Sequence, residues 1–195
     1  FYEVIMIPLG DKVARAMKDN PRGLFIGKKY AKMSEEDKPL PLYKEQTTSA
    51  PSIVYDVVKE ANLNKNKKVL EVGTGSGWQT VIMAQLAKHV FTIEIQPDIL
   101  RKANDNFNEI GVKNITTRLG NGKYGWPDQA PFDVIIVSAA MKKIPRELGK
   151  QLTDNGFIIF PMIMDSEEQH MVKMWKDGSL KNMGPVKFVK FKKEY

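Results

Sequence analysis

The chain has 195 residues, of which 42% are hydrophobic and 27% are charged, a composition typical of a single globular domain. It contains no cysteine, which excludes disulfide frameworks, thiolate nucleophiles and cysteine-ligated zinc. The formal net charge of +7 would suit an anionic partner, but the lysines are scattered and not set in one block with aromatic residues. We therefore do not expect a nucleic-acid partner.

No apolar run approaches the roughly 20 residues that cross a bilayer, so we expect no membrane partner. The chain starts at Phe1, and its first residues lack the basic and apolar pattern of a secretory leader. We expect a few residues to precede Phe1, and a cytoplasmic location.

Residues 1–55 are rich in Pro and Lys and contain one short amphipathic segment, at residues 11–18. The Pro39-Leu40-Pro41 run cannot be helical and is expected to be extended. A helix is expected to begin near Ser52, whose hydroxyl is available to cap it. We interpret residues 1–55 as a lid on the substrate side and residues 56–195 as a cofactor-binding core.

From residue 69 onward, apolar runs alternate with helical stretches at 78–88 and 97–110. This rhythm predicts an α/β fold with a doubly wound, mostly parallel sheet that is covered on both faces. Beyond Gly156 the strands follow one another without helices, with a turn around Asp177-Gly178, which predicts a C-terminal antiparallel hairpin. The expected strands are 69–72, 90–95, 115–119, 134–138, 157–162, 169–175 and 186–191.

The last expected strand alternates apolar residues with lysines, and this pattern continues to Lys192 and Lys193. Lysines on an edge strand oppose aggregation, and we interpret Lys187, Lys190, Lys192 and Lys193 in this way.

Three glycines at alternate positions follow the first buried run, in Glu71-Val72-Gly73-Thr74-Gly75-Ser76-Gly77. Such glycines let backbone amides approach a ligand where a Cβ would collide. A dinucleotide-binding loop would need its third glycine at Trp78, which argues against a dehydrogenase. An acid two residues before Gly-x-Gly-x-Gly instead resembles the first motif of the S-adenosylmethionine-dependent methyltransferases, in which Glu71 would face the ammonium end of the cofactor.

In a doubly wound sheet the ligand lies outside the carboxyl ends of the strands. Glu94 ends the second expected strand, 21 positions after Gly73 (94 − 73), where an acid typically accepts hydrogen bonds from ribose hydroxyls. Asn121 lies between Gly120 and Gly122 at the end of the third strand. This turn either contacts an adenine or is only a turn, and the sequence favours neither.

The fourth expected strand ends in Ser138-Ala139-Ala140, which lacks the Pro-Pro-aromatic element of many amino-group methyltransferases and leaves room for a substrate backbone. The same strand end has no acidic cluster for magnesium, so we expect no metal site. His89 and His170 fall in no catalytic constellation. A carboxylate acceptor explains the missing base, because a carboxyl group with a pKa of about 4 is already ionised at neutral pH. Such an acceptor needs placement and escape from water.

The most specific element is Gln46-Thr47-Thr48-Ser49-Ala50-Pro51. With this element, the glycine loop and matches at 120–127, 131–133, 138–145 and 184–189, nearly the whole chain resembles the protein-L-isoaspartate (D-aspartate) O-methyltransferase family. The resemblance implies a protein repair enzyme that uses S-adenosylmethionine, without a metal, to methylate the carboxylate of isoaspartyl residues in damaged peptides and proteins.

By this resemblance the active-site serine is Ser49, a neutral donor that would orient the acceptor carboxylate without quenching it. Ser138 and Ala139 are expected on the substrate side. The expected cofactor-binding residues come from the loop, the strand ends and the resemblance together: Gln46, Thr47, Thr48, Glu71, Gly73, Thr74, Gly75, Ser76, Gly77, Glu94, Ile95, Gly120, Asn121 and Gln169.

The chain departs from the family pattern at several positions. Tyr43-Lys44-Glu45 replaces a usual Gly-x-Gly before the Gln-Thr element, which predicts a reshaped substrate loop. Asn121 replaces a usual aspartate, Trp78 a usual tyrosine and Ile163 a usual glycine. Two alternatives stay open at this level: a divergent methyltransferase that acts on RNA or another peptide carboxylate, and a non-catalytic module that only binds the cofactor.

Overall fold

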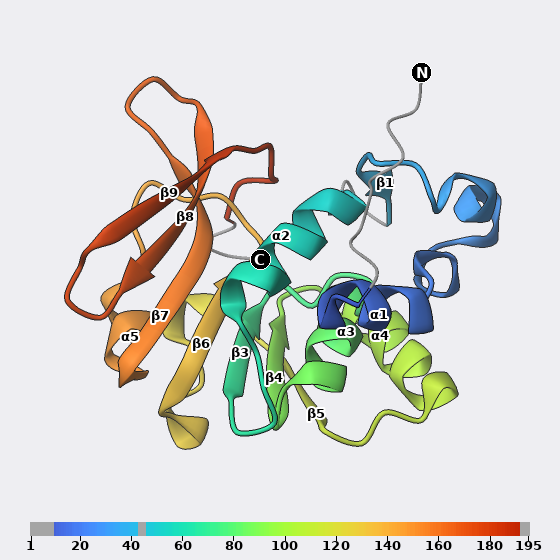
Figure 1. The fold of residues 1–195 in the computed structure, drawn as a ribbon, viewed down its shortest axis with the longest axis horizontal. Coiled ribbons are helices and arrows are strands. Elements are labelled where there is room, and N and C mark those ends of the chain that lie inside the picture. Colours follow the sequence, from blue (N-terminus) through green and yellow to red (C-terminus); the bar gives the residue numbers. More distant parts are fainter. Residues whose placement is uncertain (1–9, 43–45, 192–195) are drawn as a thin grey trace.

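The computed structural model describes residues 10–42 and 46–191. Its main sheet contains β3 (Lys68–Val72), β4 (His89–Glu94), β5 (Ile115–Leu119), β6 (Phe132–Val137), β7 (Leu152–Ile163), β8 (Gln169–Trp175) and β9 (Leu180–Pro185). The strand order is β5-β4-β3-β6-β7-β8-β9 (Figure 1). Strands β3 to β7, the first five strands of this sheet along the chain, pair in parallel. Strands β8 and β9 add an antiparallel hairpin. The predicted fold class is therefore confirmed.

Helices cover both faces of this sheet. Four of them contribute to one buried apolar cluster: α1 (Lys12–Asp19), α2 (Pro51–Ala61), α3 (Trp78–Leu86) and α4 (Pro97–Ile110). The cluster on the opposite face includes Leu148 of the short helix α5 (Arg146–Lys150). Figure 1 shows α1, α3 and α4 grouped at one end of the molecule and the β8–β9 hairpin at the other.

Shorter elements connect these layers. A small antiparallel pair joins β1 (Leu40–Pro41) to β2 (Thr47–Thr48), which agrees with the predicted extended run at Pro39. Single 3-10 turns cover Arg22–Phe25, Lys28–Met33, Gly122–Tyr124 and Pro127–Gln129. None of the helices in the described part of the chain has the length and apolar composition that a membrane span requires.

Helix α4 has the predicted bounds, since Pro97 stands at its start and Gly111 ends it with a φ of 76°. Helix α2 differs from the prediction at its cap. It begins at Pro51, and the Asp37 carboxylate accepts a hydrogen bond from the Ser52 backbone N–H at 2.9 Å. The predicted Ser52 cap is therefore wrong, because a carboxylate 15 positions earlier in the chain takes that place.

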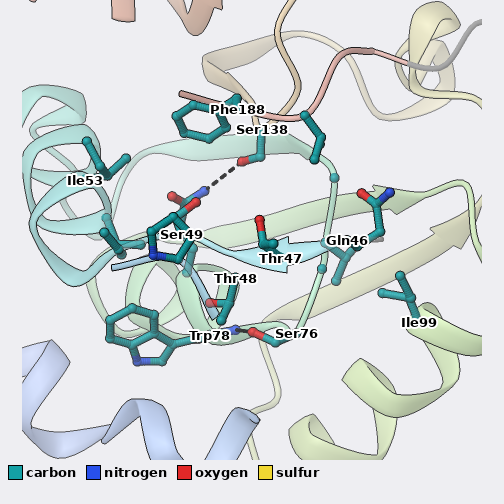
Figure 2. A pocket seen from close by; sticks show the side chains of 18 of the residues that line it. Gln46, Thr47, Thr48, Ser49, Ile53, Ser76, Trp78, Ile99, Ser138 and Phe188 are labelled. Atoms are coloured by element: carbon teal, nitrogen blue, oxygen red, sulfur yellow. Dashed lines mark hydrogen bonds between the residues drawn. The ribbon is translucent and has the colours of Figure 1, made fainter. Parts of the chain in front are cut away.

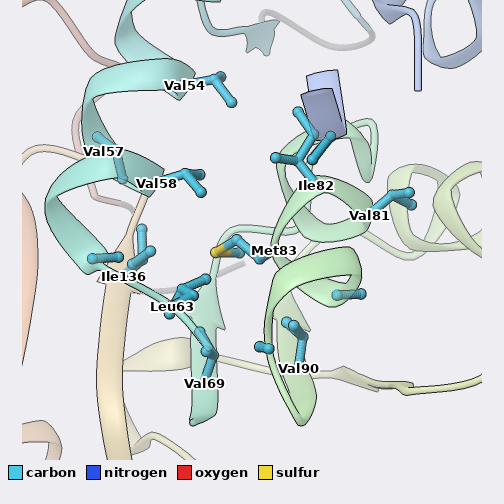
Figure 3. Packing of buried hydrophobic residues seen from close by; sticks show 14 of the residues in the cluster. Val54, Val57, Val58, Leu63, Val69, Val81, Ile82, Met83, Val90 and Ile136 are labelled. Carbon is cyan, nitrogen blue, oxygen red and sulfur yellow. The ribbon is translucent and has the colours of Figure 1, made fainter. Parts of the chain in front are cut away.

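The larger core cluster joins the N-terminal segment to the sheet (Figure 3). Helices α2 and α3 pack their apolar faces on one side of the strands. Val13, Ala16 and Phe25 from the N-terminal segment belong to the same cluster. The side chains that meet at its centre include Val54, Val57, Val58, Leu63, Val69, Ile82, Met83, Val90 and Ile136.

The final strand is where the prediction is wrong. The predicted turn at Asp177-Gly178 is present, but pairing resumes directly after it, so β9 covers Leu180–Pro185 and not 186–191. A short turn sets the register of a hairpin, and the residues next to it pair first. The segment 186–191 then runs past the end of β6, where Ala140 N–H donates to the Val189 carbonyl and Phe191 N–H donates to the Ala140 carbonyl.

This course also changes the role of the lysines. Lys187 and Lys190 do not lie on an edge strand, and each lines a cavity that is described below. Lys192 and Lys193 lie outside the described residues. Helix α5 was not predicted, because five residues between Pro145 and Gln151 are too few for a periodic pattern to be read.

Candidate active site

The order of the sheet reverses between β3 and β6, and a ligand crevice is expected beyond the carboxyl ends of those strands. A cavity of about 250 Å³ lies there. Figure 2 shows the side chains of the β2 segment, the glycine loop and the C-terminal segment around it. The sequence-predicted residues that line it are Gln46, Thr47, Thr48, Ser49, Glu71, Gly73, Thr74, Gly75, Ser76, Glu94 and Ser138.

A second cavity, of about 70 Å³, adjoins the first. The two share Gln46, Gly73, Glu94, Ser138 and Val189 as lining residues. The remaining predicted residues on this side are Ile95, Gly120, Asn121 and Ala139, and all four line it. The structure thus brings the expected adenine side next to the expected methyl-transfer side.

Backbone conformation explains two of the loop glycines. Gly73 has a φ of 101°, and a Cβ there would lie 3.4 Å from the Ser138 Cβ at the end of β6. A side chain at Gly73 would therefore be strained and would narrow the crevice. Gly77 serves packing instead, because a Cβ there would lie 2.4 Å from the Phe107 ring of α4. Gly77 does not line either cavity.

Glu94 fixes the glycine loop to the end of β4. One carboxylate oxygen accepts from the Gly75 N–H at 3.0 Å. The other accepts from the N–H groups of Ile95 and Gln96 at 2.9 and 3.0 Å. Three backbone donors hold this carboxylate in place at the junction of the two cavities, and hydrogen bonds to an ionised acceptor are the stronger kind.

Glu71 is fully buried at the end of β3. Its carboxylate accepts from the hydroxyls of Thr80 and Thr92 at 2.5 and 2.7 Å and from the Gln79 amide at 3.0 Å. Burial is the main cause that raises the pKa of this carboxyl, the nearby Glu94 charge also raises it, and the three hydrogen bonds lower it, with a net pKa of about 7. Near neutral pH the Glu71 carboxyl is therefore partly protonated and partly ionised, and it lines the larger cavity.

Ser49 follows β2 directly and lines the larger cavity. Its side chain lies near Ile53 and faces the cavity, and Phe188 lies across from it (Figure 2). The capping carboxylate of α2 belongs to Asp37, so the Ser49 hydroxyl is not used to cap that helix. Ser49 is half-buried, and its hydroxyl can donate a hydrogen bond to a ligand in the cavity.

Gln169 is a predicted site residue that lines neither cavity. Its side-chain amide donates to the Phe188 carbonyl at 3.1 Å, and its oxygen accepts from the Phe188 N–H at 2.7 Å. Gln169 thus holds residues 186–191, which include the cavity residue Phe188, in place beside the cavity. Asn121 lines the smaller cavity, and its side-chain oxygen accepts from the Lys123 N–H at 2.9 Å.

Sequence reasoning missed part of the cavity wall. Ile53 and Val54 were seen only as helix residues, Trp78 was seen as a departure from the family pattern, and Phe188 and Val189 were expected in a strand. Phe188-Val189 was part of the family resemblance, which was the available signal for a place near the site. The altered Tyr43-Lys44-Glu45 segment lies outside the described residues.

Neither histidine lines the two cavities. His89 bonds to the Thr116 hydroxyl at 2.8 Å, and His170 contacts the side chain of Asn182. Within residues 10–42 and 46–191, no three His, Cys, Asp or Glu side chains gather in a way that could hold a metal ion.

Comparison with known proteins matches this arrangement to one family. A family model described as protein-L-isoaspartate(D-aspartate) O-methyltransferase (PCMT) matches residues 6–194. Among curated proteins, the protein-L-isoaspartate O-methyltransferase of Gloeobacter violaceus is 38% identical over 185 residues, which cover 93% of this chain and 90% of the relative. The enzyme of that name from Pyrococcus horikoshii is 40% identical over 184 residues, covering 92% and 84%.

Solved structures agree. A protein-L-isoaspartate O-methyltransferase superimposes with a TM-score of 0.85 at 28% identity, covering 93% of this chain and 61% of the solved one. A putative enzyme of the same kind from Plasmodium falciparum, solved in complex with S-adenosyl-L-homocysteine, gives a TM-score of 0.84 at 24% identity and covers 95% and 93%.

Proposed function

The chain belongs to the protein-L-isoaspartate(D-aspartate) O-methyltransferase family, and from that premise we propose that it transfers a methyl group from S-adenosylmethionine to the carboxylate of L-isoaspartyl residues in damaged peptides and proteins. One observation carries the proposal. The cavity beyond the ends of β3 and β6 is lined both by the glycine loop and by the Gln46–Ser49 segment, which is the most specific element of the family pattern.

The residues present fit the cofactor. Gly73 and Gly122 keep its crevice open, since a Cβ at Gly122 would lie 2.2 Å from the Val72 side chain. Glu94, at the junction of the two cavities, is the proposed ribose acceptor, and Glu71 the proposed partner of the ammonium end. When bound, S-adenosylmethionine supplies an electrophilic methyl group on a sulfonium.

The chain's own residues then act by placement. We assign to the Ser49 hydroxyl the role of donating a hydrogen bond to the acceptor carboxylate. Because this donor is neutral, it orients the carboxylate and leaves its charge, and so its nucleophilicity, in place. Ile53, Val54 and Phe188 supply apolar walls that exclude water from the acceptor. A general base is not required, because the acceptor is already ionised at neutral pH.

The methylated product explains the repair. The methoxy group of an ester leaves the carbonyl carbon far more readily than an oxygen leaves a carboxylate. The backbone amide nitrogen therefore attacks the ester carbonyl, the C–OCH₃ bond breaks, the amide proton goes to the methoxide to give methanol, and a succinimide forms. Hydrolysis of that ring returns part of the material as normal aspartate. We further propose that residues 1–55 form the substrate-side segment and residues 56–195 the cofactor core, and that the protein acts in the cytoplasm, which cell fractionation would test.

The test is methyl transfer from labelled S-adenosylmethionine to two peptides that differ only in isoaspartate or aspartate at one position. Base-labile label on the isoaspartyl peptide alone is the expected result. Absence of label on both peptides, with S-adenosylhomocysteine binding intact by calorimetry, would move the search for the acceptor to RNA and other peptide carboxylates.

A further inference from the structure

Arg22 is a buried cation that the proposed reaction does not use. Its side chain is 2% exposed, and its Nε has no hydrogen-bond partner among the described residues. Burial lowers the pKa of the guanidinium to about 10, so the group still carries its charge at neutral pH. A buried charge is costly unless it is well solvated by the protein, which indicates that the position has a specific use.

The hydrogen bonds of Arg22 all reach backbone carbonyls of one region. One terminal nitrogen donates to the Glu36 carbonyl at 3.2 Å, and the other donates to the carbonyls of Lys38 and Thr48 at 2.8 and 3.3 Å. Lys38 comes two residues before β1, and Thr48 is the last residue of β2. The guanidinium therefore holds the start of one strand and the end of the other.

The Arg22 guanidinium also lies over the ring of Trp78, next to the glycine loop. Its guanidinium carbon lies 5.6 Å from the ring centre of Trp78, the first residue of the helix after the glycine loop. The Trp78 indole N–H is fixed in turn by a hydrogen bond to the Asn20 carbonyl at 2.8 Å. A cation over an indole is the strongest of the cation–π pairs. Trp78 also lines the larger cavity.

We propose that Arg22 is a positioning residue that locks the β1–β2 pair, and through it Ser49, at a fixed place relative to the cofactor loop. Ser49 follows Thr48 directly, so the carbonyl that Arg22 holds lies one peptide unit from the proposed acceptor-binding hydroxyl. An arginine suits this position because its planar fork presents several donors in a rigid geometry, while a lysine presents one flexible ammonium.

The variant Arg22→Lys keeps the charge and removes the fork. Because small displacements in a reactive complex are costly, we expect kcat/KM for an isoaspartyl peptide to fall by roughly 10- to 100-fold. The Kd of S-adenosylhomocysteine should change less than kcat/KM, because Arg22 lines neither cavity and the glycine loop keeps its contact with Glu94. Hydrogen exchange should become faster at the amides of Lys38, Leu40 and residues 46–49 and stay unchanged in α1.

Two controls separate positioning from general destabilisation. Val13→Ala weakens the buried N-terminal packing without touching the β1–β2 pair, and Arg101→Lys changes an exposed arginine of α4. Neither should change kcat/KM for the peptide. The proposal would be overturned if Arg22→Lys kept the wild-type kcat/KM. It would also be overturned if Arg22→Lys lost peptide turnover and cofactor affinity together and Val13→Ala showed the same loss.

The kinetic readout rests on the proposed function, but the exchange readout does not. If the wild-type protein fails to methylate the isoaspartyl peptide, the proposed function fails. The exchange rates at Lys38, Leu40 and residues 46–49 alone then decide the role of Arg22. If Arg22→Lys does not fold, Trp78→Phe, which keeps a ring but weakens the cation–π contact, replaces it. Faster exchange in those two segments supports the inference, and unchanged exchange overturns it.

Discussion

The Glu94 carboxylate accepts a hydrogen bond from the backbone N–H of Gly75 at 3.0 Å, which ties the end of β4 to the loop after β3. These two residues are 19 positions apart in the chain (94 − 75), and their contact joins the two predicted cofactor-binding elements. A single side chain thus sets the shape of the loop and also faces both cavities.

Replacing Glu94 by glutamine should weaken cofactor binding. The amide NH₂ of glutamine would face at least one of three backbone donors that now point at a carboxylate. We expect the Kd of S-adenosylhomocysteine, measured by calorimetry, to rise by roughly 10- to 100-fold. Glu109→Gln, on an exposed position of α4, is the matched control and should bind as the wild type does. Equal affinity of Glu94→Gln and wild type would remove the proposed ribose role.

Glu71 should make the stability of the protein depend on pH. Its pKa in the folded state is about 7, above the ordinary value of 4.5, so between those values the folded state holds a proton that the unfolded state has lost. Stability is therefore expected to fall as pH rises from about 4.5 to 7 by an amount on the order of 3 kcal/mol, and to change little from this group at higher pH.

Urea unfolding at several pH values measures this effect. In Glu71→Gln the slope between pH 5 and 7 should flatten, because the amide does not titrate and the threonine hydroxyls can turn to accept or donate. The matched control is Glu109→Gln, which should keep the wild-type slope. A slope that is the same in Glu71→Gln and wild type would show that other groups set the pH dependence.

Ser49→Ala tests the proposed acceptor contact. Loss of one hydrogen-bond donor at the reacting group should lower kcat/KM for the isoaspartyl peptide by about 10- to 100-fold, with cofactor affinity unchanged. Ser52→Ala, three residues further on at the start of α2, serves as the control, and its activity should equal that of the wild type. Full activity in Ser49→Ala with normal cofactor binding would remove the role assigned to Ser49.

Gly122→Ala should damage the adenine side by steric overlap. The added Cβ would lie 2.2 Å from Val72 Cγ1, and Val72 is held in the central strand β3. We expect a loss of roughly 1–3 kcal/mol in unfolding free energy, together with weaker S-adenosylhomocysteine binding. Gly149→Ala in α5 has no atom within 4 Å of its Cβ and should be neutral or slightly stabilising. A neutral result for Gly122→Ala would mean that β3 yields more easily than its packing indicates.

The sequence by itself determined six of the seven strands of the main sheet, the cofactor loop and the identity of most cavity residues. Each of these depends on a local signal: the period of apolar residues predicted α4 to its bounds, and glycines mark the places where backbone must approach a ligand. The family pattern added Ser49, which local chemistry alone could not have distinguished from a capping residue.

Only the tertiary structure decided how distant segments meet. The path of residues 186–191 across the end of β6 depends on where the β8–β9 pairing ends. The capping of α2 by Asp37 depends on how the 14 residues between Asp37 and Ser52 fold back (52 − 37 − 1). Likewise, the raised pKa of Glu71 comes from burial, and the position of Arg22 between Thr48 and Trp78 comes from packing. These properties arise from contacts between residues far apart in the sequence, and such contacts leave no periodic or local mark in the chain itself.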